Sequence, residues 1–453
     1  MSLPRHGEQK DSGVTWLGLV PNAWDISPLK HLANFVNGCV FKPDSWSESG
    51  TPIIRIENLN GSLNFNFYNG EIDAKHHVSK GDLLFGWSGN RGTSFGPFVW
   101  RTAGRHFLNQ HIFKVQPIGC NDRWLYWCLR AVTAHVEDQA TGIIGMVHVT
   151  KGDLGAIKVP VPEPFEQLAI ATFLDRETAK IDALIAEQEK FIALLAEKRQ
   201  ATISHAVTRG LNPNAPLKDS GVAWLGEVPA HWDIKTIKRL VLSIEQGWSP
   251  QCENFPANDL GEWGVLKVGC VNGGVFAPTE NKKLPDDLPP QLQYSLRKGD
   301  LLVSRANTRE LVGSAAVVPE DFPQLLLCDK LYRLRLNLDQ CLPQFAAAVI
   351  GTREARGQIE LDATGASSSM LNIGQSVVLD LQLPLPDVTE QLEIVDFLRI
   401  ESSRFDDLSV ACHRAIALLK ERRSALISAA VTGQVDVRTA MPPTARTPEA
   451  LPA

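Results

Sequence analysis

The segment KDSGVTWLGLVPNAWDISPLKHL at residues 10–32 recurs as KDSGVAWLGEVPAHWDIKTIKRL at residues 218–240. Fifteen of its 23 positions are identical at a constant offset of 208 residues. Such identity is far above chance, and internal repeats define an architecture more firmly than local propensities do. The chain therefore contains two copies of one structural plan.

The correspondence continues through each copy at a slowly growing offset, as expected when loops differ in length and the scaffold is retained. Two of the matched segments are β-branched runs that end in Asn-Gly, a turn pair typical after a strand. Each copy is therefore predicted to contain strands as well as a helix. The matched pairs are IIRIENLNG (53–61) with VLKVGCVNG (265–273), KGDLL (80–84) with KGDLL (298–302), and IFKV (112–115) with LYRL (331–334).

Each copy closes with a proline-rich start followed by a long run without Gly or Pro. PVPEPFEQLAIATFLDRETAKIDALI begins at residue 160, and PLPDVTEQLEIVDFLRIESSRFDDLS begins at residue 384. The runs end at Gly210 and Gly433, where glycine can adopt the left-handed cap. This pattern predicts two helices of about 43 residues, each roughly 65 Å long at 1.5 Å per residue.

Helices of this length are not stable through propensity alone and need an apolar partner along their length. Apolar residues recur at a spacing of three to four in both runs, from Phe173 to Val207 and from Phe397 to Val431. We expect the two helices to pair with each other in antiparallel fashion, as in a coiled coil. The alternative is that each helix packs only on its own domain.

The predicted fold is α+β, with two related mixed α/β domains, two long antiparallel helices that separate them, and a pseudo-two-fold internal repeat. Residues 436–453 are rich in Pro and Ala without periodicity, which is typical of a disordered tail. The predicted boundaries are an N-terminal segment at 1–23, the first domain at 24–159, the first helix at 160–210, a linker repeating the N-terminal segment at 211–231, the second domain at 232–383, the second helix at 384–435, and the tail at 436–453.

Composition places the chain among ordinary globular proteins. The 453 residues carry a net charge of −6, which argues against a nonspecific polycation. Residues 83–121 nevertheless contain no Asp or Glu, and this stretch holds Arg91, Arg101, Arg105 and Lys114. The eight cysteines are scattered and indicate reduced structural thiols. No apolar run is long enough to span a membrane and no signal peptide is evident, so we expect a soluble cytoplasmic protein.

Catalytic motifs are missing from the sequence. There is no GxxxxGK[ST] phosphate loop, no Asp-Pro-Pro-Tyr or Asn-Pro-Pro-Tyr base-holding motif, no HExxH and no GxSxG. His76-His77 is interpreted as a solvated loop because adjacent histidines point apart and no third metal ligand is nearby. Residues 141–145 are interpreted as a tight turn, and the matched Asp182 and Asp406 as solvent-facing. We therefore predict no catalytic residue and no metal ligand.

The repeated KDSGVxWLGxVPxxWD segments, the PxPxxxEQ helix starts, and the helix ends ISHAVTRG (203–210) and ISAAVTGQ (427–434) resemble the specificity subunit of type I restriction-modification enzymes. The resemblance extends to about residue 437. It implies a noncatalytic reader in which two target-recognition domains each read half of a bipartite DNA sequence. It also implies that the helices separate these domains and bind two adenine-methyltransferase subunits, with restriction and translocase subunits in the full complex. The resemblance places S-adenosylmethionine on the methyltransferase partners, and we expect no cofactor in this chain.

Polar side chains near the matched strands are the predicted DNA contacts. Arg pairs bidentately with guanine, and Asn or Gln with adenine. The four repeated tryptophans, Trp16, Trp24, Trp224 and Trp232, are predicted to pack in the core because readers of different sequences would need to vary their contacts. The predicted DNA-binding residues are Arg91, Thr93, Ser94, Arg101, Arg105, Asn109, Gln110 and His111 in the first domain, and Lys267, Asn272, Arg305, Asn307, Thr308, Arg309, Lys330 and Ser367 to Ser369 in the second.

Two other classes of protein remain open at this point. The first is a free-standing bipartite DNA-binding or scaffold protein whose helices bind other partners. The second is an enzyme with an unrecognised site. Copurifying proteins would distinguish the first from a restriction-modification subunit, and modification of DNA by the chain alone would favour the second.

Overall fold

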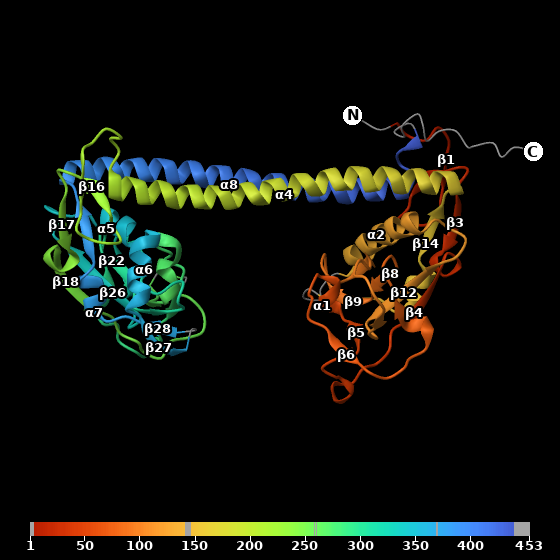
Figure 1. Ribbon diagram of the computed structural model, residues 1–453, viewed down its shortest axis with the longest axis horizontal. Helices are drawn as coiled ribbons and strands as arrows, with labels where there is room; N and C mark the ends of the chain where they lie inside the picture. Colours follow the sequence, from red (N-terminus) through yellow and green to blue (C-terminus); the bar gives the residue numbers. More distant parts are fainter. Residues whose placement is uncertain (1–3, 141–145, 258, 260, 368–369, 439–453) are drawn as a thin grey trace, which may run out of the picture. The chain divides into compact units, whose positions relative to one another are not determined.

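A computed structural model describes residues 4–140, 146–257, 259, 261–367 and 370–438 (Figure 1). Contacts divide the chain into two units, of which unit 1 comprises residues 1–188 and 413–453 and unit 2 comprises residues 189–412. Both boundaries fall within the long helices α4 (Pro164–Arg209) and α8 (Val388–Val431). Each unit therefore contains the first part of one helix and the last part of the other.

Unit 1 contains two four-stranded sheets. In the first, with the order β10-β8-β12-β4, all pairs are antiparallel. In the second, with the order β6-β5-β11-β7, β11 and β5 are parallel. The elements are β1 (Gln9–Asp11), β2 (Leu19–Pro21), β3 (Asp25–Pro28), β4 (Ala33–Asn37), β5 (Thr51–Ile54), α1 (Ile56–Leu59), β6 (Asn66–Tyr68), β7 (His77–Val78), β8 (Leu83–Gly86), β9 (Ser88–Asn90), β10 (Gly96–Val99), β11 (His106–Leu108), β12 (Ile112–Pro117), α2 (Asp122–Gln139), β13 (Met146–His148), α3 (Lys151–Ala156) and β14 (Lys158–Val161).

Unit 2 repeats this plan, with sheet orders β18-β26-β22-β24 and β20-β19-β25-β21. The counterpart of α2 is two shorter helices, α5 and α6, separated at Gly351 and Thr352. The elements are β15 (Leu217–Asp219), β16 (Glu227–Pro229), β17 (Asp233–Thr236), β18 (Val241–Gln246), β19 (Gly264–Leu266), β20 (Asn281–Lys283), β21 (Ser295–Leu296), β22 (Leu301–Ser304), β23 (Ala306–Asn307), β24 (Ala315–Val317), β25 (Phe322–Leu326), β26 (Leu331–Leu336), α5 (Pro343–Ile350), α6 (Arg353–Leu361), β27 (Thr364–Ser367), β28 (Met370–Asn372), α7 (Gln375–Leu379) and β29 (Gln382–Leu385).

The two leucines of the repeated KGDLL motif begin an inner strand of a four-stranded antiparallel sheet in both units, β8 in unit 1 and β22 in unit 2. The residues of β8 and β22 are fully buried, as expected for a strand covered on both faces. The aspartate that precedes each of these strands forms an ion pair with a basic side chain of the neighbouring strand. In unit 1, Lys114 Nζ lies 2.7 Å from Asp82 Oδ2. In unit 2, Arg335 Nε lies 2.8 Å from Asp300 Oδ1, and the buried Arg333 lies 3.7 Å from Asp300 Oδ2.

The repeated tryptophan and the repeated Glu-Gln pair take part in one set of hydrogen bonds at the start of each long helix. Glu166 Oε2 accepts a hydrogen bond from Trp24 Nε1 at 2.7 Å, and Glu390 Oε2 accepts one from Trp232 Nε1 at 3.0 Å. The following glutamine, Gln167, accepts from the backbone N–H of Asn121 at the start of α2. These bonds join the repeated segment, the domain and the start of the long helix, with buried polar groups satisfied. Gln391 makes the same bond to Leu342 at the start of α5.

Each long helix ends in the core of the other unit. Ile427, Ala430 and Val431 of α8 pack in the core of unit 1, with Trp24 and Phe173. The core of unit 2 takes up the end of α4 through Ala206 and Val207. The alternative that each helix packs only on its own domain is therefore wrong.

The antiparallel helix pair is confirmed by two ion pairs between α4 and α8. Asp182 pairs with Arg423 within unit 1, and Arg199 pairs with Asp406 within unit 2. These pairs are related by the repeat, because residues 182 and 199 correspond to residues 406 and 423 at the offset of 224. The two aspartates face solvent as predicted, with 54% and 65% of their side-chain surface exposed, and each also pairs with an arginine of the opposite helix.

Two smaller features complete the description. All eight cysteines are free, and burial raises the pKa of the Cys341 thiol to about 12. In the described part of the chain, no helix is both long and apolar enough to cross a membrane. Residues 436–438, which the sequence assigns to the tail, are packed: Val437 is buried in unit 1, and the backbone N–H of Asp436 donates to Pro4 O.

We expect Glu166→Ala to lower the free energy of unfolding by about 1–3 kcal/mol, because it leaves the buried Nε1–H of Trp24 without an acceptor. Glu166→Gln keeps an oxygen at this position and should cost less. Denaturant titration followed by circular dichroism measures the change, with the exposed Glu187→Ala as the control. Equal losses for the alanine and glutamine variants would contradict this role of the Trp24–Glu166 bond.

Candidate nucleic-acid interface

The acid-free stretch of residues 83–121 forms the strands from β8 to β12 and their loops, but its cations are not equally free. Besides its ion pair with Asp82, Lys114 donates to the carbonyl oxygen of His77 at 2.8 Å. Arg101 and Arg105 are exposed on the loop between β10 and β11. The guanidinium of Arg105 lies 5.9 Å from the centre of the Phe107 ring. The two loop arginines are therefore the cations of this stretch that are best placed to meet phosphate.

Arg91 and its neighbours form a turn that is tied to the end of α2. The guanidinium of Arg91 donates to the carbonyl oxygens of Glu137 and Ala140, where helical carbonyls lack intrahelical partners. Ser94 is buried, and its Oγ accepts from the backbone N–H of Asn90 at 2.8 Å. Burial argues against the prediction that Ser94 contacts DNA, whereas Thr93 is exposed on the same turn.

Asn109, Gln110 and His111 lie on the tight connection between β11 and β12. The Oδ1 of Asn109 accepts from the backbone N–H of His111 at 3.3 Å, so part of its side chain stabilises the turn. The Nε2 atoms of Gln110 and His111 are 3.2 Å apart. The carbonyl oxygen of Gln110 accepts from the indole Nε1 of Trp87 at 2.9 Å. The structure thus gathers this predicted group around a half-buried tryptophan that sequence reasoning did not select.

Trp87 is also in contact with His148, which comes from the distant strand β13. The ring centres of Trp87 and His148 are 4.9 Å apart, and His148 is exposed. The strand pairing explains the proximity, because Ser88 of β9 lies opposite His148. Comparison of the two copies could have identified Trp87, because it aligns with the predicted contact Arg305 when the two KGDLL motifs are aligned.

In unit 2 the structure brings two predicted asparagines together. Asn307 Nδ2 lies 3.4 Å from Asn272 Oδ1, and Asn307 Oδ1 accepts from the backbone N–H of Thr308. Arg309 is exposed beside them. Lys267 does not belong to this group. Its Nζ lies 3.7 Å from Oε2 of Glu280, whose negative charge weakens the attraction of Lys267 for phosphate.

Arg305 and Lys330 form a second predicted group. A terminal nitrogen of Arg305 donates to the carbonyl oxygen of Asp329 at 3.2 Å, and the guanidinium lies 5.8 Å from the centre of the Tyr332 ring. The backbone N–H of Arg305 donates to the carbonyl oxygen of Lys330. Ser367 lies on β27, while Ser368 and Ser369 are outside the described residues.

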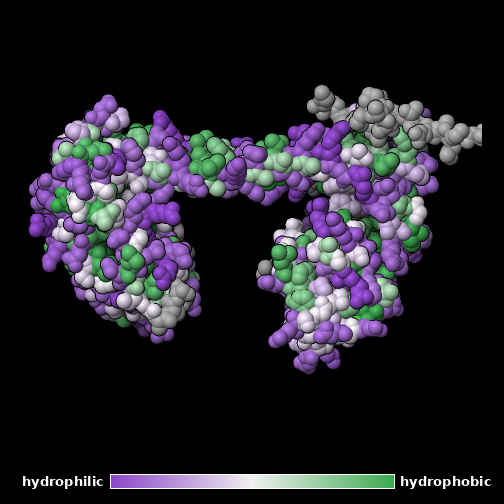
Figure 2. Space-filling model, in the orientation of Figure 1, coloured by the Kyte–Doolittle hydropathy of each residue, from purple (hydrophilic) through white to green (hydrophobic). Residues whose placement is uncertain are grey.

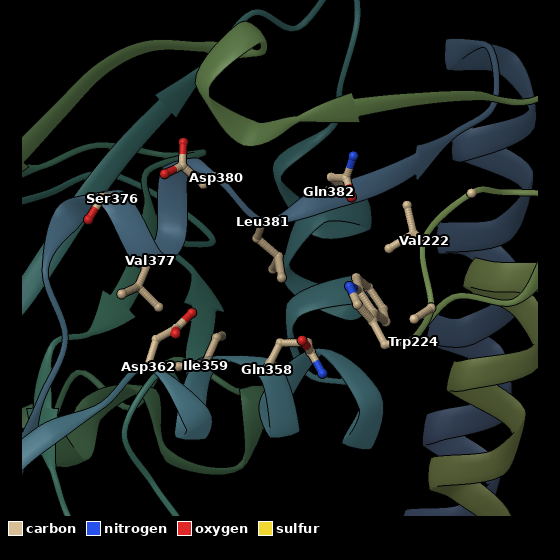
Figure 3. Close-up of a pocket in the computed structure, with 12 residues that line it drawn as sticks. Val222, Trp224, Gln358, Ile359, Asp362, Ser376, Val377, Asp380, Leu381 and Gln382 are labelled. Carbon is tan, nitrogen blue, oxygen red and sulfur yellow. The ribbon is translucent and has the colours of Figure 1, made fainter.

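The repeated tryptophans take up core positions, as predicted, in the case of Trp24 and Trp232, which are both fully buried. Trp16 is half-buried and stacks on His135 of α2, with ring centres 4.8 Å apart. Its counterpart Trp224 lines a pocket of about 630 Å³ in unit 2 (Figure 3). Asp362 and Asp380 also line this pocket, and their negative charge is opposite to what a phosphate backbone requires.

The histidine pair and the acidic and thiol side chains of the described residues were the remaining candidates for a metal site. Within the described ranges, no cluster of three or more His, Cys, Asp or Glu is arranged to hold a metal ion. The nitrogen Nδ1 of His76 lies 2.7 Å from Asn37 O, and Nε2 of His77 lies 3.2 Å from Ile72 O, so the two rings have separate backbone partners. The segment 141–145, interpreted from sequence as a tight turn, lies outside the described residues.

Known proteins are similar to this chain in sequence and in fold. Residues 21–192 match the family model described as the type I restriction modification DNA specificity domain. The EcoEI specificity subunit of Escherichia coli is 29% identical over 178 residues, which are 38% of this chain and 30% of that protein. The EcoBI specificity subunit of Escherichia coli is 22% identical across 94% of this chain and 89% of the relative. The MjaVIII subunit of Methanocaldococcus jannaschii is 23% identical across 92% and 94%.

Two solved structures share the fold along nearly the whole chain. One comes from work on complex assembly and conformational transition of the type I R-M system, with a TM-score of 0.61, 16% identity, and coverage of 92% of this chain and 99% of that one. The other is the HsdS subunit from Thermoanaerobacter tengcongensis, with a TM-score of 0.50, 14% identity, and coverage of 92% and 98%.

The repeated fold, its exposed polar loops and these matches define a noncatalytic DNA-recognition protein. The chain belongs to the specificity subunits of type I restriction enzymes. Its family identity, anticipated from the repeated motifs, is thus confirmed.

The contacts of Arg91 predict a measurable difference between two arginines of the same stretch. Arg91→Ala removes the donor to the end of α2 and should lower the stability of the chain by up to about 1 kcal/mol. Arg101→Ala alters an exposed loop and should leave the stability unchanged within about 0.5 kcal/mol. Thermal unfolding measures both, and an equal effect of the two substitutions would contradict the capping role of Arg91.

Proposed function

We propose that each unit reads one half of an asymmetric, bipartite DNA sequence and that the chain acts in the cytoplasm. The observation that carries the proposal is the internal repeat itself. The two units share strand order and buried bonds, yet their exposed loops carry different side chains, as with Arg101 and Arg105 in unit 1 and the Asn272–Asn307 pair in unit 2. Phosphate contacts position a DNA-binding protein, and base contacts specify the sequence. Two units with the same backbone fold but different loop side chains therefore support two different half-sites.

The long helices support a second part of the proposal, namely that they set the spacer and bind two adenine-methyltransferase subunits. Leu184 and Leu408 occupy equivalent positions of α4 and α8 and are 52% and 45% exposed, and Leu194 and Leu418 are 49% and 56% exposed. Figure 2 shows hydrophobic surface along the helices. Apolar residues exposed in matched pairs suit two copies of one partner.

The partners would supply the chemistry. We assign S-adenosylmethionine to the methyltransferase subunits, and a restriction and translocase subunit to the full complex. The test is copurification of the tagged chain from its host, followed by methyl transfer from labelled S-adenosylmethionine to DNA. We expect transfer with the copurified partners and none with the chain alone. Transfer by the chain alone would favour an enzyme, and partners of another class would favour a scaffold.

The unequal loops predict an asymmetric target. Long-read sequencing of host DNA with and without the gene should locate methylated adenines in a bipartite motif whose two half-sites differ. The physical reason is that the side chains at matched surface positions present different hydrogen-bond patterns to the base edges. Two identical inverted half-sites would contradict this prediction.

The helix register predicts the effect of lengthening the spacer. The ion pairs Asp182–Arg423 and Arg199–Asp406 fix the antiparallel register of α4 and α8. In this register the peptide bond after Lys190 lies opposite the peptide bond after Arg414. Four helix-forming residues inserted at both positions add roughly 6 Å and about one turn, which is close to the rise of two base pairs. We expect unchanged half-site bases and a gap that grows by one or two base pairs.

The control for this insertion places the same four residues in the exposed turn after Asn214, outside both helices. Methylation mapping of both variants gives the result. An unchanged gap in the double insertion, or altered half-site bases, would show that the helices do not set the spacer.

A further inference from the structure

Trp87 and Arg305 occupy the same backbone position in the two units. Each follows the buried KGDLL strand, and each backbone N–H donates to the neighbouring connection, to His111 O at 3.3 Å and to Lys330 O at 2.9 Å. Each carbonyl oxygen accepts from the strand-following residue, Val149 in unit 1 and Ile373 in unit 2. The backbone frame is therefore the same while the side chains differ completely.

The side chains at this position are also held in equivalent ways. Trp87 Nε1 donates to the carbonyl oxygen of Gln110, and a terminal nitrogen of Arg305 donates to that of Asp329. Beneath them lie Phe113 and Tyr332, which are equivalent residues of β12 and β26. A tryptophan and an arginine thus rest on matched aromatic rings and point along matched paths, each half-buried.

Unpaired polar atoms gather at this matched position. Among the described residues, four buried side-chain nitrogen or oxygen atoms have no hydrogen-bond partner, and two of them are Gln110 Oε1 and Arg305 Nε. A buried polar atom without a partner destabilises the free protein. Two such atoms at the matched sites of two diverged units leave hydrogen-bonding capacity that a ligand could complete.

The two unpaired atoms differ in chemistry. Arg305 Nε is a donor, and its neighbour Lys330 adds donors only. Gln110 Oε1 is an acceptor beside His111, whose imidazole offers a donor or an acceptor. In the major groove, guanine presents two acceptors, whereas adenine and cytosine present an amino donor. The matched sites therefore suit opposite base edges.

We propose that this matched site determines base specificity in both units: Arg305 reads guanine in the half-site of unit 2, and Gln110, supported by Trp87 and His148, reads an amino-bearing base in that of unit 1. The inference rests on the proposed function, because it needs a bipartite DNA target. Trp87 acts as a positioning residue, since its indole N–H is used by the Gln110 carbonyl.

The test uses the chain with its copurified partners, expressed in a host free of other adenine methylation. Long-read sequencing first gives the wild-type motif, and methylation of duplexes with each base replaced in turn then gives the discrimination at every position. Thermal unfolding of each variant checks the fold.

For unit 2, the variants are Arg305→Ala and Arg305→Gln. The alanine variant should lose roughly 5- to 150-fold of discrimination at one guanine of one half-site, with the other half-site unchanged. The glutamine variant keeps a donor for Asp329 O and should move the preference at that position from guanine toward adenine. Arg297→Ala, an exposed arginine of the same unit, is the matched control and should keep the whole motif.

For unit 1, Gln110→Ala should relax one position of the other half-site, where the wild type requires adenine or cytosine. The exposed Gln139→Ala is its control. Folded variants that keep every base of the motif would overturn the inference. A uniform loss of affinity at all sequences with a flatter salt dependence would also overturn it, because it indicates phosphate contacts.

The failure of the broader proposal would look different. A wild-type complex that methylates DNA without any fixed bipartite motif contradicts the proposed function itself. A wild-type complex with a fixed bipartite motif, together with unchanged motifs in Arg305→Gln and Gln110→Ala, removes only the matched base-reading site.

Discussion

The hydrogen bond between the repeated tryptophan and the first glutamate of each long helix is the interaction on which the structure depends. Trp24 with Glu166 and Trp232 with Glu390 join a short repeated segment to the start of a helix inside a closed core. The end of the opposite helix packs against the same tryptophan, with Gly433 next to Trp24 and Gly210 next to Trp232. Because each tryptophan holds the start of one helix and the end of the other, neither unit is complete without both helices.

This arrangement separates what must stay constant from what can vary. The ion pairs behind KGDLL, the Glu-Gln helix starts and the antiparallel Asp–Arg pairs recur in both units because they maintain the frame. The loops at the ends of β8 and β12, and of β22 and β26, also present exposed side chains that differ between the units, and substitutions of exposed side chains usually cost little stability. A rigid scaffold with variable loops allows a DNA-binding protein to recognise a different DNA sequence while it keeps the same fold.

The basic stretch of unit 1 shows why charge alone is a weak guide to a binding surface. Arg91 and Lys114 are used within the protein, by carbonyl oxygens at the end of α2 and by Asp82. Arg101 and Arg105 remain exposed. In unit 2 the same division separates Lys267, paired with Glu280, from the exposed Arg309. Partners that are distant in sequence decide which charges are available to phosphate.

The sequence by itself determined the repeat and the two long helices, because identical motifs and helical periodicity can be read directly from the order of residues. The DNA-reading family followed from the resemblance of the repeated motifs to those of known specificity subunits. The sequence also selected Gln110, His111, Arg305 and Lys330. Only the tertiary structure decided that the end of α8 packs in the core of unit 1 and the end of α4 in the core of unit 2. It also decided that Asp182 and Asp406 are paired and that Ser94 is buried. It alone placed His148 beside Trp87, since β13 reaches β9 across nearly sixty residues of chain. These features depend on packing between segments far apart in sequence, which no local pattern records.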